Sequence, residues 1–396
     1  MGDFSSKEEV NKHMTNKCKF VKFENFTRST AWAALCLGLF TFGLGLPAKA
    51  EDDKPTIITF DAPGAGTAAF EGTYPNAITP AGAITGFYFD ANFDDHGFLR
   101  ARDGNFIVFD PVGSIGTAPF SINPTGAITG FYFEDLGGPA HGFLRAPDGT
   151  ITTFDAPGAG TGHNFQGTYP YNINPAGAIA GIYQDASNVY HGFLRAPDGS
   201  ITTFDAPGAG TGPRQGTFTS TEDGLNPAGA LSGNYTDDAN ASHGFVRAPD
   251  GTFTIFNAPG AGTGPGAGTI VGGINPAGLT EGFYIDAAGL NHGFVRAADG
   301  TITTFDVQGA GTGSGQGTIA GNINTPGMID GQFIDASGMY HGFLRSKHGV
   351  ITKYDVPGAG TGSGQGTMVG ISTPTGTTTG SYVDANNVVH GYLLVP

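Results

Sequence analysis

The sequence predicts an all-β fold, a seven-bladed β-propeller built from four-stranded antiparallel blades. Three observations lead to this prediction. One unit, marked by His-Gly-aromatic, recurs seven times between Thr56 and the end of the chain. Each unit holds short strand-forming segments separated by Gly and Pro turns. The last unit lacks one strand, and a strand of that kind stands alone at the start.

The repeat unit reads, in consensus, ITTFDAPGAGTG, QGT, INPAGAITG, YxDAxxxx and HGFLRAPDG. The spacings between successive marker histidines are 45, 50, 52, 49, 49 and 49 residues. Beyond residue 50 there are only five Glu and three Lys, whereas Gly, Thr, Phe, Ile and Pro recur at strand and turn positions. This composition disfavours helix and favours strands.

Four strands are expected in each unit, in the segments ITTFD, GTxxxxIN, AITGxYxD and HGFLRA. The NPAG and APDG sequences suit tight reversals, because Pro and Gly fall at the positions that such turns prefer. A short loop such as DASNV joins the third and fourth of these segments. The Gly-rich APGAGTGxxQ segment is longer, so we place the boundary between blades there.

The two ends of the repeat region divide one blade between them. The chain ends at His390–Pro396 without an ITTFD partner, and an unattached Thr56–Asp61 precedes the first complete unit. Pairing of these two segments would close a ring and leave no exposed sheet edge. A parallel β-helix or an open array of sheets is the alternative architecture.

Residues 1–50 are predicted to be a secretory signal peptide, and residues 51–396 a single propeller domain. Basic residues precede an apolar run from Ala31 to Leu46, and Pro47–Ala50 offers small residues for cleavage before Glu51. Translation from Met14 would give a shorter leader. A membrane anchor is the alternative, but the run is shorter than a spanning helix needs. We expect a secreted, periplasmic or cell-surface protein without membrane insertion after cleavage.

The charge and the cysteines restrict the partners and the chemistry. The whole chain has a net charge of -16. Seven of its 18 basic and four of its 34 acidic residues precede Glu51, which leaves 11 against 30. Nucleic acid is therefore excluded as a partner. Cys18 and Cys36 both lie in the leader, so the exported part has no disulfide. We expect it to be a monomer.

The HGFL, TTFD, INPAG and ITG segments together resemble the HAF repeat of extracellular bacterial proteins. The resemblance covers residues 56–396. Gly here replaces the family's Ala after His, and Asp-Ala-Pro-Gly-Ala-Gly replaces its Leu-Gly-Thr-Leu-Gly-Gly, so this is a divergent HGF subtype. The resemblance implies an exported repeat protein with a propeller-like fold and implies no activity.

The marker histidines are interpreted as structural residues. They occupy the same position in successive blades, where the symmetry of a ring keeps them apart and so disfavours a shared metal. We expect each to form a hydrogen bond, with the Asp of YxDA as the partner. We expect the Arg four residues later to pair with an Asp of PDG or TFD. The histidines are His96, His141, His191, His243, His292, His341 and His390.

Calcium is the one cofactor that the sequence leaves open. An exported acidic protein with Asp-rich loops can supply hard oxygen ligands, although no DxDxDG loop is present. The candidate ligands are Asp94, Asp95, Asp237 and Asp238. No other cofactor is expected, and the Gly-rich loops lack the context of a phosphate-binding loop.

Binding residues are sought among those that break the repeat, since one site is not built from seven identical copies. The Gly-rich loops and the YxDA loops should share one face of a propeller, and loops on a rigid scaffold commonly carry binding. The candidates on that face are Glu71, His163, Asn164 and Arg214. No catalytic residue is predicted, because no catalytic motif surrounds the non-repeated polar residues.

The predicted function is that of an exported, non-enzymatic β-propeller that binds a glycan, a protein or a cell-envelope component. A purely structural or adhesive surface repeat is a second hypothesis. A carbohydrate-active enzyme, a glycoside hydrolase or lyase, is a third. High similarity among the units favours the first two, because an enzyme's units diverge around its reacting centre.

Overall fold

The computed structural model describes residues 55–221 and 223–396, so the predicted signal peptide lies outside the described residues. These residues form 28 strands and no helix. Hence no helix in this part of the chain is long and apolar enough to cross a membrane. The all-β prediction is confirmed.

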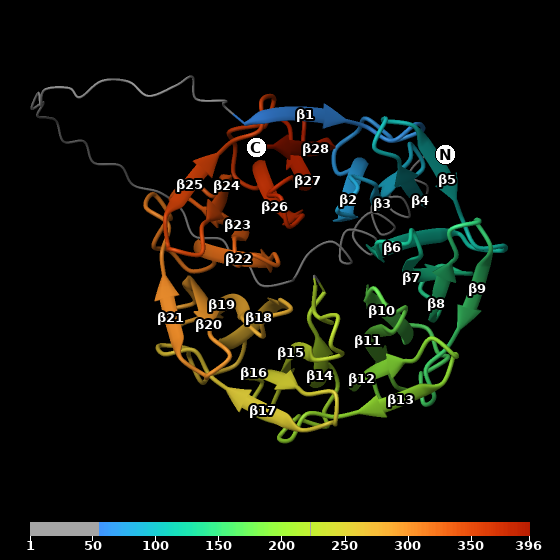
Figure 1. The fold of residues 1–396 in the computed structure, drawn as a ribbon, viewed down its shortest axis with the longest axis horizontal. Helices are drawn as coiled ribbons and strands as arrows, with labels where there is room; N and C mark the ends of the chain where they lie inside the picture. The colour runs from blue at the N-terminus through green and yellow to red at the C-terminus, as the bar shows by residue number, and fades with distance from the viewer. Residues whose placement is uncertain (1–54, 222) are drawn as a thin grey trace, which may run out of the picture.

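The strands follow one another in antiparallel groups of four that correspond to the sequence unit. In the first group, β2 (Gly72–Ile78) pairs with β3 (Ile84–Phe89), β3 with β4 (Asp95–Arg100), and β4 with β5 (Phe106–Phe109). Figure 1 shows the groups arranged around a common centre, with the first strand of each group innermost and the fourth at the rim. We call each group a unit and number its strands first to fourth.

The other units repeat these bounds with small changes. The first strands are β6 (Gly116–Ile122), β10 (Gly167–Ile173), β14 (Gly216–Thr219), β18 (Gly268–Ile274), β22 (Gly317–Ile323) and β26 (Gly366–Ser372). The second strands are β7 (Ile128–Phe133), β11 (Ile179–Gln184), β15 (Leu231–Thr236), β19 (Thr280–Ile285), β23 (Ile329–Ile334) and β27 (Thr378–Val383). The third strands are β8 (Ala140–Arg145), β12 (Tyr190–Arg195), β16 (Ser242–Arg247), β20 (Asn291–Arg296), β24 (Tyr340–Arg345) and β28 (Val389–Val395). The fourth strands are β9 (Ile151–Phe154), β13 (Ile201–Phe204), β17 (Phe253–Phe256), β21 (Ile302–Phe305) and β25 (Ile351–Tyr354).

The strand β1 (Thr56–Phe60) lies against β28 at the other end of the chain. The two pair antiparallel from Thr56↔Val395 to Phe60↔Gly391. His390 Nδ1 lies 3.0 Å from a carboxylate oxygen of Asp61, repeating at this junction a contact found within other units. The N-terminal strand therefore occupies the position of the fourth strand beside β28.

A glycine that recurs at the start of the first strand joins six of the units to the preceding one. Gly167 pairs in parallel with Ala140 of the preceding third strand, and Gly72 pairs in the same way with Val389. Gly72 has a φ of 116°, a conformation that glycine adopts without strain. A Cβ on this residue would also collide with the Val389 carbonyl oxygen. The Gly of the QGT segment is thus required by both backbone conformation and close packing.

A ladder of buried asparagines from the INPAG turns links neighbouring units. The amide of Asn226 donates to the carbonyl of Asn275 at 3.3 Å, and that of Asn275 donates to Asn324 at 3.2 Å. The Asn226 side-chain oxygen also accepts two N–H groups of its own turn, from Ala228 and Ala230. One side chain therefore fixes both the turn and the contact between units.

We expect Asn226→Ala to lower the free energy of unfolding by about 2 kcal/mol, because it leaves buried turn N–H groups and a carbonyl without partners. Urea denaturation measures this loss. The matched control is Asn105→Ala, in an exposed turn, which should change stability by less than about 0.5 kcal/mol. Equal effects of the two substitutions would contradict the role assigned to the ladder.

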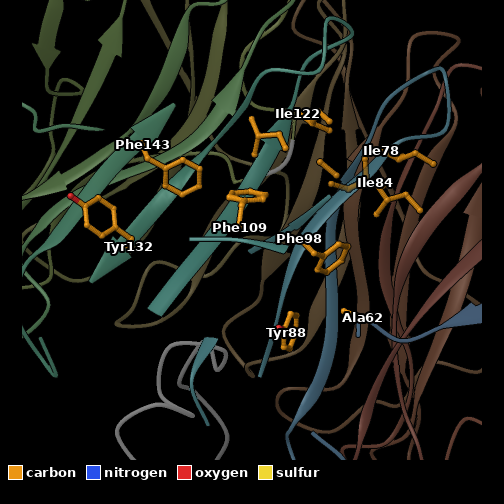
Figure 2. Packing of buried hydrophobic residues seen from close by; sticks show 12 residues of the cluster. Ala62, Ile78, Ile84, Tyr88, Phe98, Phe109, Ile122, Tyr132 and Phe143 are labelled. Atoms are coloured by element: carbon orange, nitrogen blue, oxygen red, sulfur yellow. The ribbon is translucent and has the colours of Figure 1, made fainter. Parts of the chain in front are cut away.

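The cores of the units are aromatic and aliphatic, and neighbouring units share them. Phe98 and Phe143, from the third strands β4 and β8, are fully buried. Phe109 of β5 packs edge-on against Phe143 of the next unit, with ring centroids 6.1 Å apart. Figure 2 shows these rings together with Ile84 and Ile122. Each fourth strand therefore packs against the third strand of the following unit.

The repeated arginines contribute to this packing rather than forming the expected close ion pairs. The Arg145 guanidinium lies over the Phe109 ring at 4.9 Å, and the same stacking recurs at Arg195 over Phe154. Burial lowers the pKa of Arg145, and the carboxylate of Asp148 partly offsets the effect. The Asp of the PDG turn thus acts on the arginine at a distance, while the direct contact is cation–π.

Candidate functional site

Two adjoining cavities lie at the loop end of the first two units. Aromatic side chains line one of them, which we call the aromatic pocket and which encloses about 640 Å³ when the open solvent at its mouth is included. Its lining combines strands β3, β6 and β7 with the following loops. The lining residues are Phe87, Phe89, Asp95, Ile115, Gly116, Ala118, Phe120, Phe131, Phe133, Asp135, Leu136, Gly137 and Phe165.

The second cavity, which we call the acidic cavity, opens beside the first and holds about 710 Å³ of open space. It shares Asp95, Ile115, Gly116 and Leu136 with the aromatic pocket. The lining is completed by Asp94, His96, Asp110 and Ser114. The two cavities therefore join an apolar surface to a negatively charged one.

A shortened link between β5 and β6 opens this region. After Asp110 the link spans only residues 111–115, whereas after Asp155 the next link spans 156–166. Ile115 N donates to Phe133 O at 2.8 Å, the bond that Gly160 N makes with Gln184 O at 2.8 Å in the next unit. After Ile115 the chain enters β6 at once, so a counterpart of residues 161–166 is missing.

The segment missing from this link covers the same region in the other units. Gln166 folds back so that its side-chain oxygen accepts from Gly162 N at 2.9 Å. Its side-chain amide donates to Ala186 O at 3.2 Å and so ties the link to the next loop. Gln215, Gln316 and Gln365 repeat this arrangement. Without such a cover, the ends of β3 and β7 are left open.

A small residue deepens the opening. Ala118 on β6 stands at the position that larger side chains occupy in the other first strands. Those side chains are Tyr74, Tyr169, Phe218, Ile270, Ile319 and Met368. Phe87 and Phe89 on β3 and their counterparts Phe131 and Phe133 on β7 surround the vacated volume, and only these two second strands carry Phe at both positions. The pocket is therefore assembled from residues that depart from the repeat.

The join between units is also different here. Among the described residues, no parallel pair connects β4 with β6, although such a pair connects β8 with β10. The carboxylate of Asp95 occupies the space over Gly116, where an added Cβ would collide with it. Asp95 therefore lies at the boundary between the aromatic pocket and the acidic cavity.

Several rings of the aromatic pocket meet nearly at right angles, while Phe120 stacks on Phe131 at 24°. Phe131 and Phe133 cross at 77° with centroids 5.6 Å apart, and Phe133 and Phe165 cross at 80° with centroids 5.8 Å apart. Phe87 and Phe89 cross at 85° at 5.6 Å. A group placed among them would meet ring faces and ring edges from several directions.

The nearest partner of a marker histidine is not the predicted Asp of YxDA but the residue that ends TTFD in the repeat, which is an Asp at six of the histidines and Asn257 at His243. His96 Nδ1 lies 2.8 Å from Asp110, the Asp that ends TTFD in the repeat, and 4.0 Å separate its Nε2 from Asp90 of YxDA. His191 repeats this at 2.8 Å from Asp205 and 3.6 Å from Asp185. The predicted YxDA partner is thus the more distant one. Each ring also packs against the preceding Tyr or Phe, as His191 does on Tyr183 at 4.8 Å.

These contacts predict a stability maximum at mildly acidic pH. Hydrogen bonding to Asp205 raises the pKa of His191 despite burial, and Asp61 raises the pKa of His390 in the same way. The stability that these pairs add is complete below about pH 6.5 and is lost as the pH rises through the raised pKa values. Burial opposes ionisation of Asp237, but N–H donors outweigh it and lower the pKa. Its contribution is lost as the pH falls below about 4. Thermal melting from pH 3 to 9 should therefore peak between these limits, and a midpoint that rises from pH 6 to 8 would contradict the account.

The four predicted binding residues do not line either cavity. Glu71 is buried and takes the position of the folded-back Gln, since its Oε2 accepts from Ala68 N at 2.8 Å. This position gives Glu71 a structural role. His163, Asn164 and Arg214 are exposed on loops at the predicted face. Asn164 N donates to Gly137 O of the pocket at 2.9 Å, so this loop supports the pocket through its backbone.

The calcium candidates lie in two separate loops. Asp237 is engaged by its own turn, accepting from Ala239 N and Ala241 N at 2.9 Å, and it contacts His243 at 3.1 Å. Asp94 and Asp95 line the acidic cavity. In the part of the chain that the structure describes, no group of three or more His, Cys, Asp or Glu side chains is placed to hold a metal ion. A calcium site at these residues stays a prediction.

The spacing between marker histidines indicates where the site lies. The shortest spacing between marker histidines, 45 residues from His96 to His141, spans the shortened link. The longest, 52 residues from His191 to His243, spans a break in β14, after which Asp223 accepts from Asn322 Nδ2 at 2.8 Å. The spacing between marker histidines therefore indicates where the repeat changes better than the positions of unusual polar residues do.

Two solved structures are similar to this chain over most of its length. Streptogramin B lyase aligns with a TM-score of 0.53 at 12% sequence identity, covering 85% of this chain and 98% of the lyase. The BP39L lectin from Burkholderia pseudomallei aligns with a TM-score of 0.54 at 14% identity, covering 81% of this chain and 94% of the lectin. This chain has the fold of a β-propeller protein. At these identities the likeness concerns the fold alone. No protein-family model and no curated protein matches the sequence.

Proposed function

We propose that the protein is an exported, non-enzymatic binding module whose ligand site is the aromatic pocket. The scaffold is a ring of seven four-stranded blades, closed where β1 completes the blade that contains β28. The register between these strands and the His390–Asp61 contact support the closure. The apolar run and small residues of the first 50 residues support export to the periplasm, the cell surface or the medium. The resemblance to HAF repeats supports the same location.

The observation that carries the binding proposal is the coincidence of three departures from the repeat at one place. The short link 111–115, the small Ala118 and the paired Phe residues of β3 and β7 together form an apolar pocket, in which Phe133 is partly exposed and the other three rings are buried. Ile115 and Leu136 at the mouth are 42% and 50% exposed. Exposed apolar surface is costly in a soluble protein and commonly marks an interaction site.

The lining favours an apolar group of a protein or envelope component over a glycan. Phe has no polar atom, so the rings supply contact area without hydrogen bonds to hydroxyl groups. The charged groups of the lining are the carboxylates of Asp95 and Asp135. An apolar pocket with a few polar groups is the usual form of a ligand site.

Grafting a full-length link tests this proposal. Residues 111–115 are replaced by a copy of residues 206–215, which introduces the folded-back Gln found at positions 166, 215, 316 and 365. Nile red, a neutral apolar dye, is then titrated into both forms of residues 51–396. We expect saturable fluorescence enhancement with the natural chain and at least a tenfold weaker response from the graft.

The matched control replaces residues 307–316 with the same copy, which alters a link that contributes no residue to either cavity. This change should leave dye binding within about twofold, because residues 206–215 already form such a link elsewhere in the protein. Undiminished dye binding by the first graft, in a protein that still melts cooperatively, would contradict the assignment of the site.

A further inference from the structure

We propose that the group received by the aromatic pocket is an alkylated ammonium ion, such as a trimethylammonium group. The inference rests on the proposed binding function and specifies the chemistry of the ligand. It follows from the combination of ring-lined walls with two carboxylates and no basic residue in the lining. Lipid headgroups and free quaternary amines share this chemistry.

The walls of the pocket provide the first part of the argument. Six Phe rings line it; three neighbouring pairs cross at 77° to 85°, and Phe120 stacks on Phe131 at 24°. Ring faces attract cations through their quadrupole, and cages of several aromatic rings are suited to quaternary ammonium groups. A methylated ammonium ion also fills apolar space with its methyl groups.

The charge around the pocket provides the second part. Asp95 and Asp135 belong to the lining itself, and Asp94 and Asp110 line the acidic cavity beside it. Neither lining contains Lys or Arg, and the one residue that can become cationic, His96, is already within 2.8 Å of Asp110. The field at the pocket mouth therefore favours a cation over a neutral or anionic group.

The lack of hydrogen-bonding groups among the rings selects the type of cation. A primary ammonium or a metal ion would give up hydration without receiving oxygen ligands from Phe. A quaternary ammonium has no N–H group to satisfy, so its transfer into the pocket leaves no donor without a partner. The carboxylates of the lining then act through charge alone.

The experiment compares choline with 3,3-dimethylbutan-1-ol, its uncharged counterpart of nearly the same shape. Each is titrated into residues 51–396 and followed by isothermal titration calorimetry and by NMR of the ligand. We expect choline to bind at least tenfold more tightly than the alcohol, because only choline gains from the carboxylates and the ring faces. Equal affinity for the two would overturn the inference while leaving the pocket as a ligand site.

Variants separate the contribution of charge from that of shape. Asp95→Asn combined with Asp135→Asn should weaken choline binding at least fivefold and leave the alcohol within twofold. The control Asp198→Asn removes one charge in an exposed turn at the opposite end of the strands and should change neither. Unchanged choline binding in the double variant, with folding retained in a thermal melt, would also overturn the inference.

Further measurements identify the source of the ligand and separate a failure of this inference from a failure of the proposed function. Binding to phosphatidylcholine vesicles, with competition by free choline, would support a lipid headgroup as the source. Binding of free choline without vesicle binding would support a soluble amine. If choline, the alcohol and Nile red all fail to bind the folded protein, the proposed function itself is wrong. Nile red binding without choline binding overturns only the ligand class.

Discussion

Deleting residues 51–61 is expected to abolish the cooperative unfolding of the whole domain. This deletion removes β1, whose five residues pair with β28 from Thr56↔Val395 to Phe60↔Gly391. It also removes Phe60, over which the Arg100 guanidinium lies at 4.7 Å, and the partner of His390. The exposed edge of β28 would then be free to pair with other chains.

The measurement is a thermal melt followed by circular dichroism, with size-exclusion chromatography to detect aggregates. A shorter deletion of residues 51–55 is the control, because it stops just before β1 and should melt like the full domain. A cooperative transition within a few degrees of the full domain after removal of β1 would show that the closing strand is dispensable. That result would argue against a closed ring.

Ala118→Phe is expected to eliminate ligand binding without loss of stability. The substitution fills the vacated volume with the side chain that Phe218 places at the same position of another first strand. Binding of Nile red and of choline should fall by at least tenfold. Filling a cavity with an apolar group should leave the free energy of unfolding unchanged or raise it by about 1 kcal/mol.

Ala118→Met, which copies Met368, is a second way to fill the pocket if the Phe ring does not fit. The matched control is Ile319→Phe, at the same strand position in another unit, and it should leave binding unchanged. Retention of full affinity in both filled variants would contradict the location of the site. A loss of affinity in the Ile319→Phe control would point to a general effect on the ring.

The fold was predictable because its information is local and repeated. Strand and turn residues recur together in each unit, so a single pattern such as INPAG predicts a turn many times over. The divided unit at the two chain ends predicted the pairing of β1 with β28, and the structure contains this pairing. The buried asparagine ladder was less accessible, because it depends on how successive units stack and not on the pattern within one unit.

The site was less predictable because it arises where one unit lacks residues that other units have. Glu71 is a candidate binding residue because its carboxylate breaks the repeat. In the structure it takes the place of a Gln and accepts a hydrogen bond from its own link. Ala118 and Ile115 are unremarkable as residue types, and their meaning comes from what the other units have at those positions. The aspartate partner of His96 is not evident from the sequence, because fourteen residues separate two side chains that adjacent strands bring together.

The central claim is that the irregular junction between β5 and β6 is the binding site, and a single tryptophan tests it most directly. The only native tryptophan is Trp32, so residues 51–396 contain none. Leu136→Trp places a reporter at the pocket mouth, and Ala186→Trp places one in the corresponding loop of the next unit. The account predicts that choline or Nile red changes the fluorescence of Trp at 136 in a saturable manner and leaves that at 186 unchanged. Equal responses at both positions, or a response at 186 alone, would contradict it.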